Sequence, residues 1–181
     1  MTKTGKLYGD SLYELAVEKN REQSGYSKSL LNDLLIVKGL FAENPDYIRL
    51  LQEPSIPRKI RLGLVDKAFG DQADSYLVNF LKLLCEEELL GEFSGCVDEY
   101  KARFQKDHNI AEAHVVSAVA LSESQKKALK AKLEEVWKKE IVLVTKTDPS
   151  LMGGMKVEIE GRQLDGSVRS RLERLHKLIE Q

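Results

Sequence analysis

The stretch 148–169, DPSLMGGMKVEIEGRQLDGSVR, constrains the fold more than any other part of the chain, because its pattern changes twice. Pro149 fixes its own φ angle, and Gly153 and Gly154 permit backbone angles that a side chain would forbid, so a turn is predicted first. Residues 155–159 then alternate between apolar and charged side chains, which is typical of a strand with one buried face. The stretch therefore predicts a turn followed by a half-buried strand.

A helix is predicted after this strand. Gly161 marks a second turn, and Asp165 is placed to cap a helix that begins beside it. Apolar residues then recur at helical spacing to the C-terminus: Val168, Leu172, Leu175, Leu178 and Ile179. We expect this helix to lay its apolar stripe on a sheet, and the same stripe is a place where a partner could dock.

The first 105 residues contain helical patterns only. Apolar residues recur at spacings of three and four in six segments, which are separated by Gly, Pro and Asn signals. The first segment ends near Asn20, the second begins between Gly25 and Ser29, and the third spans 46–51. The fourth follows Pro57 and ends before Gly70. The fifth begins at Asp74 or Ser75, and the sixth carries apolar residues from Leu89 to Phe104. Six short helices joined by short turns predict a compact N-terminal bundle.

Strand patterns begin only after residue 110. Residues 111–120 alternate as a strand, Ser122 with Gln125 gives a capping signal for a helix, and residues 141–147 form a β-branched strand. With the strand at 155–159 and the final helix, the predicted order is β-α-β-β-α. The predicted fold class is therefore α+β, with a six-helix bundle in residues 1–105, a polar linker at 106–110 and a small α/β domain in residues 111–181.

The charge balance argues against a nucleic-acid or membrane-surface partner. The chain has 28 basic and 29 acidic residues and a net charge of -1, so no long-range field recruits polyanions. No run of about 18 apolar residues is present, so no segment is predicted to span a bilayer. An apolar signal core and an Arg-rich transit peptide are also missing from the first residues, and we expect a cytoplasmic protein.

No residue pattern predicts a catalytic, cofactor or metal site. Gly153 and Gly154 precede a strand, whereas a phosphate-binding loop follows one and ends in Gly-Lys-Ser/Thr. Cys85 and Cys96 lack the paired spacing of a zinc site and fall in helical patterns, so we expect them in the core. The three histidines have no partners at ligand spacing: His108, His114 and His176.

Polar residues near two helix ends also have structural explanations. Glu86, Glu87 and Glu88 point about 100° apart on a helix, so they cannot together flank a substrate bond, and a solvated helix end is expected. Ser167 has no base placed to activate it, and a capping role is expected. Arg169 lies in the first turn of the final helix, where the dipole disfavours a cation, so we expect an outside carboxylate or a carbonyl as its partner.

The fifth helical segment is apolar on most of its circumference. It carries Phe80, Leu81, Leu83 and Leu84 in one turn and a half. Such a helix is either the centre of its own bundle or one wall of a groove that receives an amphipathic partner helix. Both alternatives are consistent with the sequence.

Three groups of residues resemble the delta subunit of F-type ATP synthases, called the oligomycin sensitivity conferral protein in mitochondria. They are Asp148-Pro149-Ser150-Leu151, then Gly153-Gly154 before the alternating strand, and Asp165-Gly166-Ser167-Val168-Arg169 followed by Arg171-Leu172. The segment from Leu7 to Ala16 is similar to the opening helix of that family, so the resemblance covers essentially the whole chain. The acidic run at 86–88 is a departure, since family members commonly have a basic residue near this point.

The resemblance implies a non-catalytic stator subunit of a proton-translocating F-type ATP synthase. In that family the N-terminal bundle binds N-terminal helices of the alpha subunits of the catalytic head, and the C-terminal domain holds the b subunit of the peripheral stalk. Carried over to this chain, the head-binding residues are Tyr8, Ser11, Leu12, Phe80 and Leu83. The stalk-binding residues are Met152, Gly153, Gly154, Asp165, Arg169 and Leu172. The family also implies a peripheral place on the cytoplasmic face of a bacterial plasma membrane, through the complex.

Other interpretations make different demands on the sequence. The E-type stalk subunit of vacuolar and archaeal ATPases has a related Gly-Gly strand and helix, but it begins with a long uninterrupted helix, whereas Pro45, Pro54 and Pro57 interrupt this chain. A small enzyme requires a pocket with a perturbed acid or base. A free-standing adaptor for helical peptides would not co-purify with an ATPase head.

Overall fold

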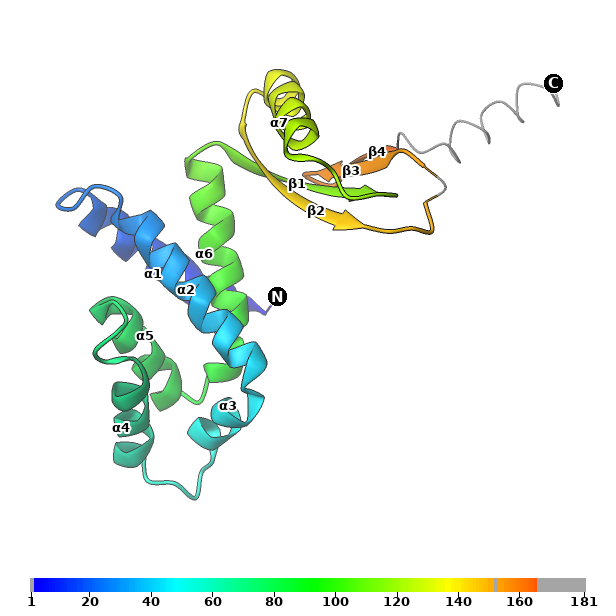
Figure 1. The fold of residues 1–181 in the computed structure, drawn as a ribbon. Helices are drawn as coiled ribbons and strands as arrows, with labels where there is room; N and C mark the ends of the chain where they lie inside the picture. The colour runs from blue at the N-terminus through cyan, green and yellow to red at the C-terminus, as the bar shows by residue number, and fades with distance from the viewer. Residues whose placement is uncertain (1, 152, 166–181) are drawn as a thin grey trace, which may run out of the picture. The chain divides into compact units, whose positions relative to one another are not determined.

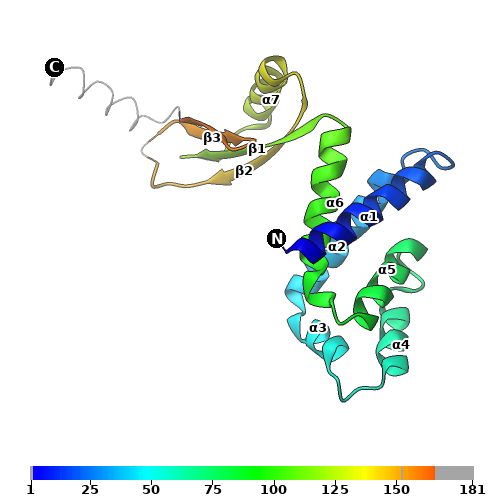
Figure 2. The ribbon, with the colours of Figure 1, turned by 180° about the vertical axis from the view of Figure 1, so that it is seen from behind.

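The computed structural model describes residues 2–151 and 153–165. Within them the fold is helix-rich α+β, with seven α-helices and one four-stranded sheet (Figures 1 and 2). This agrees with the predicted α+β class. The chain divides into two compact units, which we call the helical unit (residues 1–104) and the sheet unit (residues 105–181).

The helical unit holds the helices expected from apolar spacing. They are α1 (Lys3–Asn20), α2 (Tyr26–Glu43), α3 (Pro45–Gln52), α4 (Arg58–Phe69), α5 (Ser75–Glu86) and α6 (Phe93–Asp107), with a 3-10 turn at Leu90–Glu92 before α6. Local signals set their starts: Pro45 occupies the first turn of α3, and the Asp74 carboxylate accepts a hydrogen bond from the Tyr76 backbone N–H at 2.8 Å. The predicted end of the first helix near Asn20 and the predicted start of the fifth at Asp74 or Ser75 are confirmed.

Aromatic side chains join α1, α2 and α6 in the core of the helical unit. The rings of Tyr13 and Tyr100 stack edge to face with centroids 5.2 Å apart, and the Tyr100 hydroxyl donates to the Ser27 carbonyl at 2.9 Å. Phe41 and Phe93 make a second contact at 5.2 Å. Long-range contacts of this kind bind helices that are far apart in the sequence.

Helix α5 lies partly in this core, which explains much of its apolar circumference. Its buried residues are Leu77, Val78, Phe80, Leu81, Leu84 and Cys85. Leu83, in contrast, is 41% exposed. Cys85 and Cys96 are buried as expected, and burial raises the pKa of both thiols, that of Cys96 to about 11.

The sheet unit contains β1 (Ile110–Ser117), α7 (Glu123–Trp137), β2 (Glu140–Thr147), β3 (Met155–Ile159) and β4 (Arg162–Asp165). The strand order is β2-β1-β3-β4; β1 pairs with β2 in parallel, and the other pairs are antiparallel. The core side chains come from all three elements of the β1-α7-β2 crossover and from β3: Ala111, Ala113, Val115, Leu133, Ile141, Val157 and Ile159. Alternate side chains of β1 and β3 are therefore buried on one face, as the sequence predicts, and the structure shows that Leu133 of α7 packs on this face.

A fourth strand, β4, is absent from the predicted order, so the described order of the sheet unit is β-α-β-β-β. The loop between β3 and β4 consists of Glu160 and Gly161, both with positive φ (49° and 75°), as a tight two-residue hairpin requires. The hairpin folds residues 162–165 back onto β3, where Asp165 pairs with Lys156, so Asp165 is the last residue of a strand. The helix that Asp165 is predicted to cap lies outside the described residues. This strand has only one apolar residue, Leu164, and therefore gives no alternating signal.

Two further boundaries differ from the sequence prediction. Strand β1 ends at Ser117, before the predicted end at residue 120. Helix α6 continues to Asp107 and β1 begins at Ile110, so only His108 and Asn109 of the predicted linker lie between these elements. The predicted final helix lies outside the described residues. In the described ranges no helix is long and apolar enough to cross a membrane.

Candidate partner-binding groove

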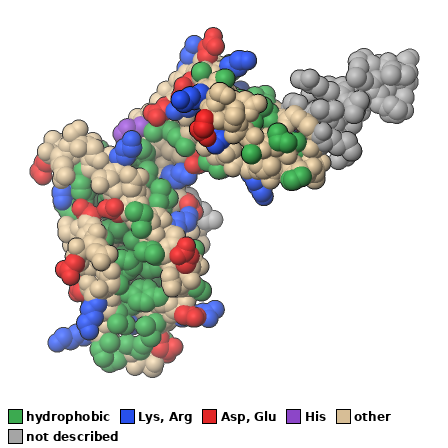
Figure 3. All heavy atoms as spheres, viewed as in Figure 1, with side chains coloured by type: hydrophobic (Ala, Val, Ile, Leu, Met, Phe, Trp, Pro, Cys, Tyr) green, Lys and Arg blue, Asp and Glu red, His purple; other side chains and the backbone are tan. Residues whose placement is uncertain are grey.

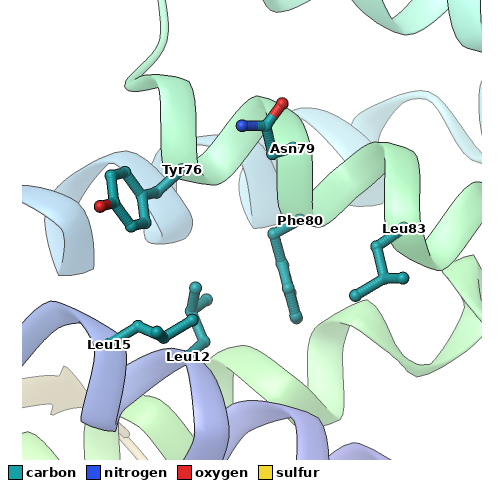
Figure 4. Close-up of a pocket in the computed structure, with 6 residues that line it drawn as sticks. All are labelled: Leu12, Leu15, Tyr76, Asn79, Phe80 and Leu83. Carbon is teal, nitrogen blue, oxygen red and sulfur yellow. The ribbon is translucent and has the colours of Figure 1, made fainter.

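An apolar groove lies between α1 and α5 in the helical unit (Figure 4). Its volume is about 200 Å³, and its lining comes from both helices: Leu12, Leu15, Tyr76, Asn79, Phe80 and Leu83. Phe80 points from α5 towards α1, and Asn79 points away from α1. The groove is open to solvent, since one leucine on each wall is partly exposed: Leu15 by 48% and Leu83 by 41%.

Helical spacing explains why these side chains converge. Tyr76, Phe80 and Leu83 are separated by four and then three residues, which places them on one face of α5. Leu12 and Leu15 are three residues apart on α1 and form the opposite wall. Leu12 and Phe80 are buried and make the floor, whereas Leu15 and Leu83 form the two rims.

The structure brings together three of the five residues that the sequence predicted for the head: Leu12, Phe80 and Leu83. Ser11 precedes Leu12 by about 100° around the helix, and its hydroxyl donates to the Leu7 carbonyl at 3.0 Å. Tyr8 lies one turn before Leu12 and is not part of the lining. Leu15, Tyr76 and Asn79 line the groove and were missed, although Leu15 follows Leu12 at helical spacing and was a usable signal.

The residues predicted for the stalk fall in two groups. Met152, Arg169 and Leu172 lie outside the described residues. Gly153 and Gly154 precede β3 with φ angles of 149° and 83°, and the Gly154 carbonyl accepts a hydrogen bond from the Ala118 N–H at 3.4 Å. Asp165 lies at the end of β4, 3.8 Å from the Lys156 ammonium. The left-handed φ of Gly154 gives a structural reason for glycine at this position.

Apolar side chains are exposed elsewhere on the helical unit too, as the green spheres of Figure 3 show. The most exposed on α2 and α4 are Ile36 at 61% and Ile60 at 54%. A second hollow of about 170 Å³ lies beside Phe41, Ile48 and Phe93, and Lys38 at its edge forms an ion pair with Asp98. The α1–α5 groove differs from this hollow because its lining is almost wholly apolar on both walls.

The titratable groups near the groove have structural roles. The Tyr26 hydroxyl donates to the Asp74 carboxylate at 2.6 Å, and burial together with Asp74 raises the pKa of Tyr26. Burial, with a contribution from Asp74, also raises the pKa of Asp33. In the described part of the chain, no three His, Cys, Asp or Glu side chains are grouped so that they could hold a metal ion.

Comparison with known proteins decides the family. The model of the ATP synthase delta (OSCP) subunit family matches residues 5–179. The chain belongs to this family. It is 30% identical over 174 residues to the ATP synthase subunit delta of Lachnoclostridium phytofermentans, covering 95% of this chain and 92% of the relative. It is 31% identical over 173 residues to that of Lactiplantibacillus plantarum, with coverage of 95% and 92%.

A chain of the solved mitochondrial ATP synthase hexamer of Toxoplasma gondii has the same fold. The TM-score is 0.71, the match covers 100% of this chain and 99% of that one, and the identity is 16%. The family match confirms the resemblance seen in the 148–169 signature and decides against the E-type stalk subunit. Members of the delta (OSCP) family are non-catalytic subunits of the stator of an F-type ATP synthase, and this is the function of the chain.

Proposed function

We propose that the α1–α5 groove binds an N-terminal helix of an alpha subunit of the catalytic head. The observation that carries this proposal is the pairing of a buried floor, Leu12 and Phe80, with two half-exposed leucine rims, Leu15 and Leu83. An amphipathic helix presents apolar side chains at i, i+3, i+4 and i+7, and an open apolar groove between two helices accepts this pattern.

The size of the groove also favours a helix as its occupant. Its volume of about 200 Å³ is below the range of roughly 300–1,000 Å³ that small-molecule pockets occupy. Its two walls run along two helices and present apolar side chains, so a third helix would complete the packing. A bound helix would cover Leu15 and Leu83, which the rest of the helical unit leaves exposed.

The rest of the proposal assigns the two units. Residues 1–105, as a six-helix bundle, bind the head. Residues 111–181, as a small α/β domain, bind the b subunit through the region of Gly153, Gly154 and Asp165. The subunit would then sit on the cytoplasmic face of the membrane only through its complex. The turn geometry at Gly154 and the position of Asp165 at a strand end are the supporting observations.

The mechanical task sets the affinity that the groove must reach. Rotation of the central rotor exerts torque on the head, so the joint between head and stalk must dissociate slowly compared with turnover. Nanomolar affinity corresponds to about 12 kcal/mol, and burial of apolar side chains supplies such energy without the salt sensitivity of exposed charge pairs. The apolar lining of the groove suits this demand.

A calorimetric titration of the full-length protein with a synthetic N-terminal peptide of the alpha subunit from the same organism tests the proposal. We expect roughly stoichiometric binding that Leu83→Asp weakens at least about a hundredfold, because the substitution places a charge on an apolar rim. Ile36→Asp, at an exposed position of α2, is the matched control and should bind like the wild type. Absence of binding by the folded wild type, or equal losses in both variants, would refute the assignment of the groove.

A further inference from the structure

The C-terminal end of α5 carries charges that its own helix disfavours. Glu86 is the last residue of α5 and Glu87 is its C-cap, and the last turn has no basic residue. The carbonyl end of a helix has a partial negative charge, so carboxylates at this end reduce stability. Glu86 is compensated by Arg58 of α4 at 2.6 Å. Arg58 also attracts the Glu87 carboxylate, but among the described residues no salt bridge to Glu87 is formed.

Glu87 lies about one helical turn beyond Leu83, the last residue of α5 that lines the groove. It follows Leu83 by four residues, so it continues the line of Tyr76, Phe80 and Leu83 along the same face of α5. Its side chain is exposed. An unfavourable charge that continues a binding surface is typical of a functional residue, because local rules of helix design are broken where a partner supplies the compensation.

A cation lies at the opposite end. Lys19 follows Leu15 by four residues on α1, and its ammonium is 4.2 Å from the centre of the Tyr76 ring. The Asp74 carboxylate at this end is already occupied, since it accepts hydrogen bonds from the Tyr26 hydroxyl and the Tyr76 N–H. From Tyr76 to Glu87 the helix rise amounts to about 16 Å, so about three turns of α5 separate the two opposite charges.

We propose that the helix bound in this groove lies antiparallel to α5, with its N-terminal end over Glu87 and its C-terminal end over Lys19. The inference rests on the proposed function and adds the direction and the charge of the partner. A helix N-terminus carries about half a positive charge, and a free amino group or a basic residue in its first turn adds to it. Glu87 attracts this end, and Lys19 attracts the carbonyl end.

The direction can be measured on the full-length protein with the same alpha-subunit peptide, carrying a nitroxide label at its first or at its last residue. The NMR amide signals of the protein report which end of the groove each label approaches. We expect the N-terminal label to broaden the signals of Leu83 and Glu87, and the C-terminal label to broaden those of Lys19 and Tyr76. The reverse pattern would overturn the proposed direction.

The role of the Glu87 charge is tested by measuring the affinity of charge variants for the peptide. Glu87→Lys should weaken binding about fivefold at low ionic strength and much less at 1 M salt, while the thermal stability stays equal or rises. Glu14→Lys makes the same charge change on α1, two residues from Leu12 and therefore on another face, and should bind like the wild type. Equal affinities of Glu87→Lys and the wild type at low salt would overturn the role of Glu87.

The outcomes separate this inference from the proposed function. If the wild type does not bind the peptide, both are refuted. If binding is lost on Leu83→Asp but the labels show the opposite direction, the groove is the binding site and only the direction is refuted.

Discussion

Gly9 on α1 packs directly against the backbone of Cys96 on α6. A Cβ atom at residue 9 would lie 2.4 Å from the Cys96 carbonyl oxygen and 2.8 Å from the Cβ of Glu99. No side chain fits at these distances, so glycine lets the two helix backbones approach each other. Leu12 follows Gly9 by less than one turn, and the close contact therefore fixes the helix that forms one wall of the groove.

Gly9→Ala should lower the free energy of unfolding by about 2–3 kcal/mol, because the added methyl forces α1 away from α6. Urea unfolding followed by far-UV circular dichroism measures the change. Gly39→Ala is the matched control, because a Cβ atom at residue 39 meets no atom within 4 Å. Gly39 is exposed within α2, so this substitution should raise the free energy of unfolding by up to about 1 kcal/mol. Equal stabilities of the two variants would contradict the close contact.

Leu15→Ala should weaken binding of the alpha-subunit peptide by about 1–2 kcal/mol, whereas Ser11→Ala should leave it unchanged. Leu15 forms a rim of the groove, and the Ser11 hydroxyl is engaged within its own helix. Because Leu15 is 48% exposed, its truncation should change folding little. Calorimetry on both variants discriminates between Ser11, which the sequence analysis predicted, and Leu15, which lines the groove in the structure.

Tyr100→Phe should destabilise the helical unit by about 1–2 kcal/mol. The substitution removes a buried hydrogen bond of 2.9 Å and leaves the Ser27 carbonyl without this donor, while the ring contact with Tyr13 is kept. Thermal unfolding of the variant against the wild type gives the difference. An unchanged midpoint would show that water replaces the hydroxyl at no cost.

Ser122→Ala should lower the stability of the sheet unit by about 1 kcal/mol. The Ser122 hydroxyl accepts a hydrogen bond from the Gln125 N–H at 3.3 Å, and the Gln125 side chain accepts one from the Ser122 N–H at 2.9 Å. The substitution removes half of this capping box. Faster hydrogen exchange confined to the first turn of α7 is the expected local signature, and uniform exchange across both units would argue against it.

The stability of the protein should depend on pH through Cys96. Burial and the nearby Glu92 raise the pKa of its thiol to about 11 in the folded state, against an ordinary value of 9.0. The folded chain therefore keeps the proton where the unfolded chain loses it. The stabilisation is complete below pH 9 and is lost as the pH rises to about 11. Compared with Cys96→Ala in urea unfolding at several pH values, the wild type should lose stability more steeply in this window.

Local signals predicted the helical unit well, because helix starts and ends depend on residues next to one another in sequence. Asp74 caps α5, Pro45 opens α3, and the apolar spacing of α5 marks the face that Phe80 and Leu83 share. The same reasoning failed for β4, whose four residues carry no alternation and form a strand only because the hairpin at Glu160 and Gly161 lays them against β3.

The sequence by itself determined the family, the α+β class and most element boundaries, because the signature at 148–169, the periodicities and the caps are local properties of the chain. Only the tertiary structure decided which residues form the groove. Leu15 and Tyr76 become its walls because the fold places α1 and α5, about 60 residues apart in sequence, on opposite sides of one groove. The approach of Gly9 to Cys96 likewise depends on long-range packing, which no local pattern encodes.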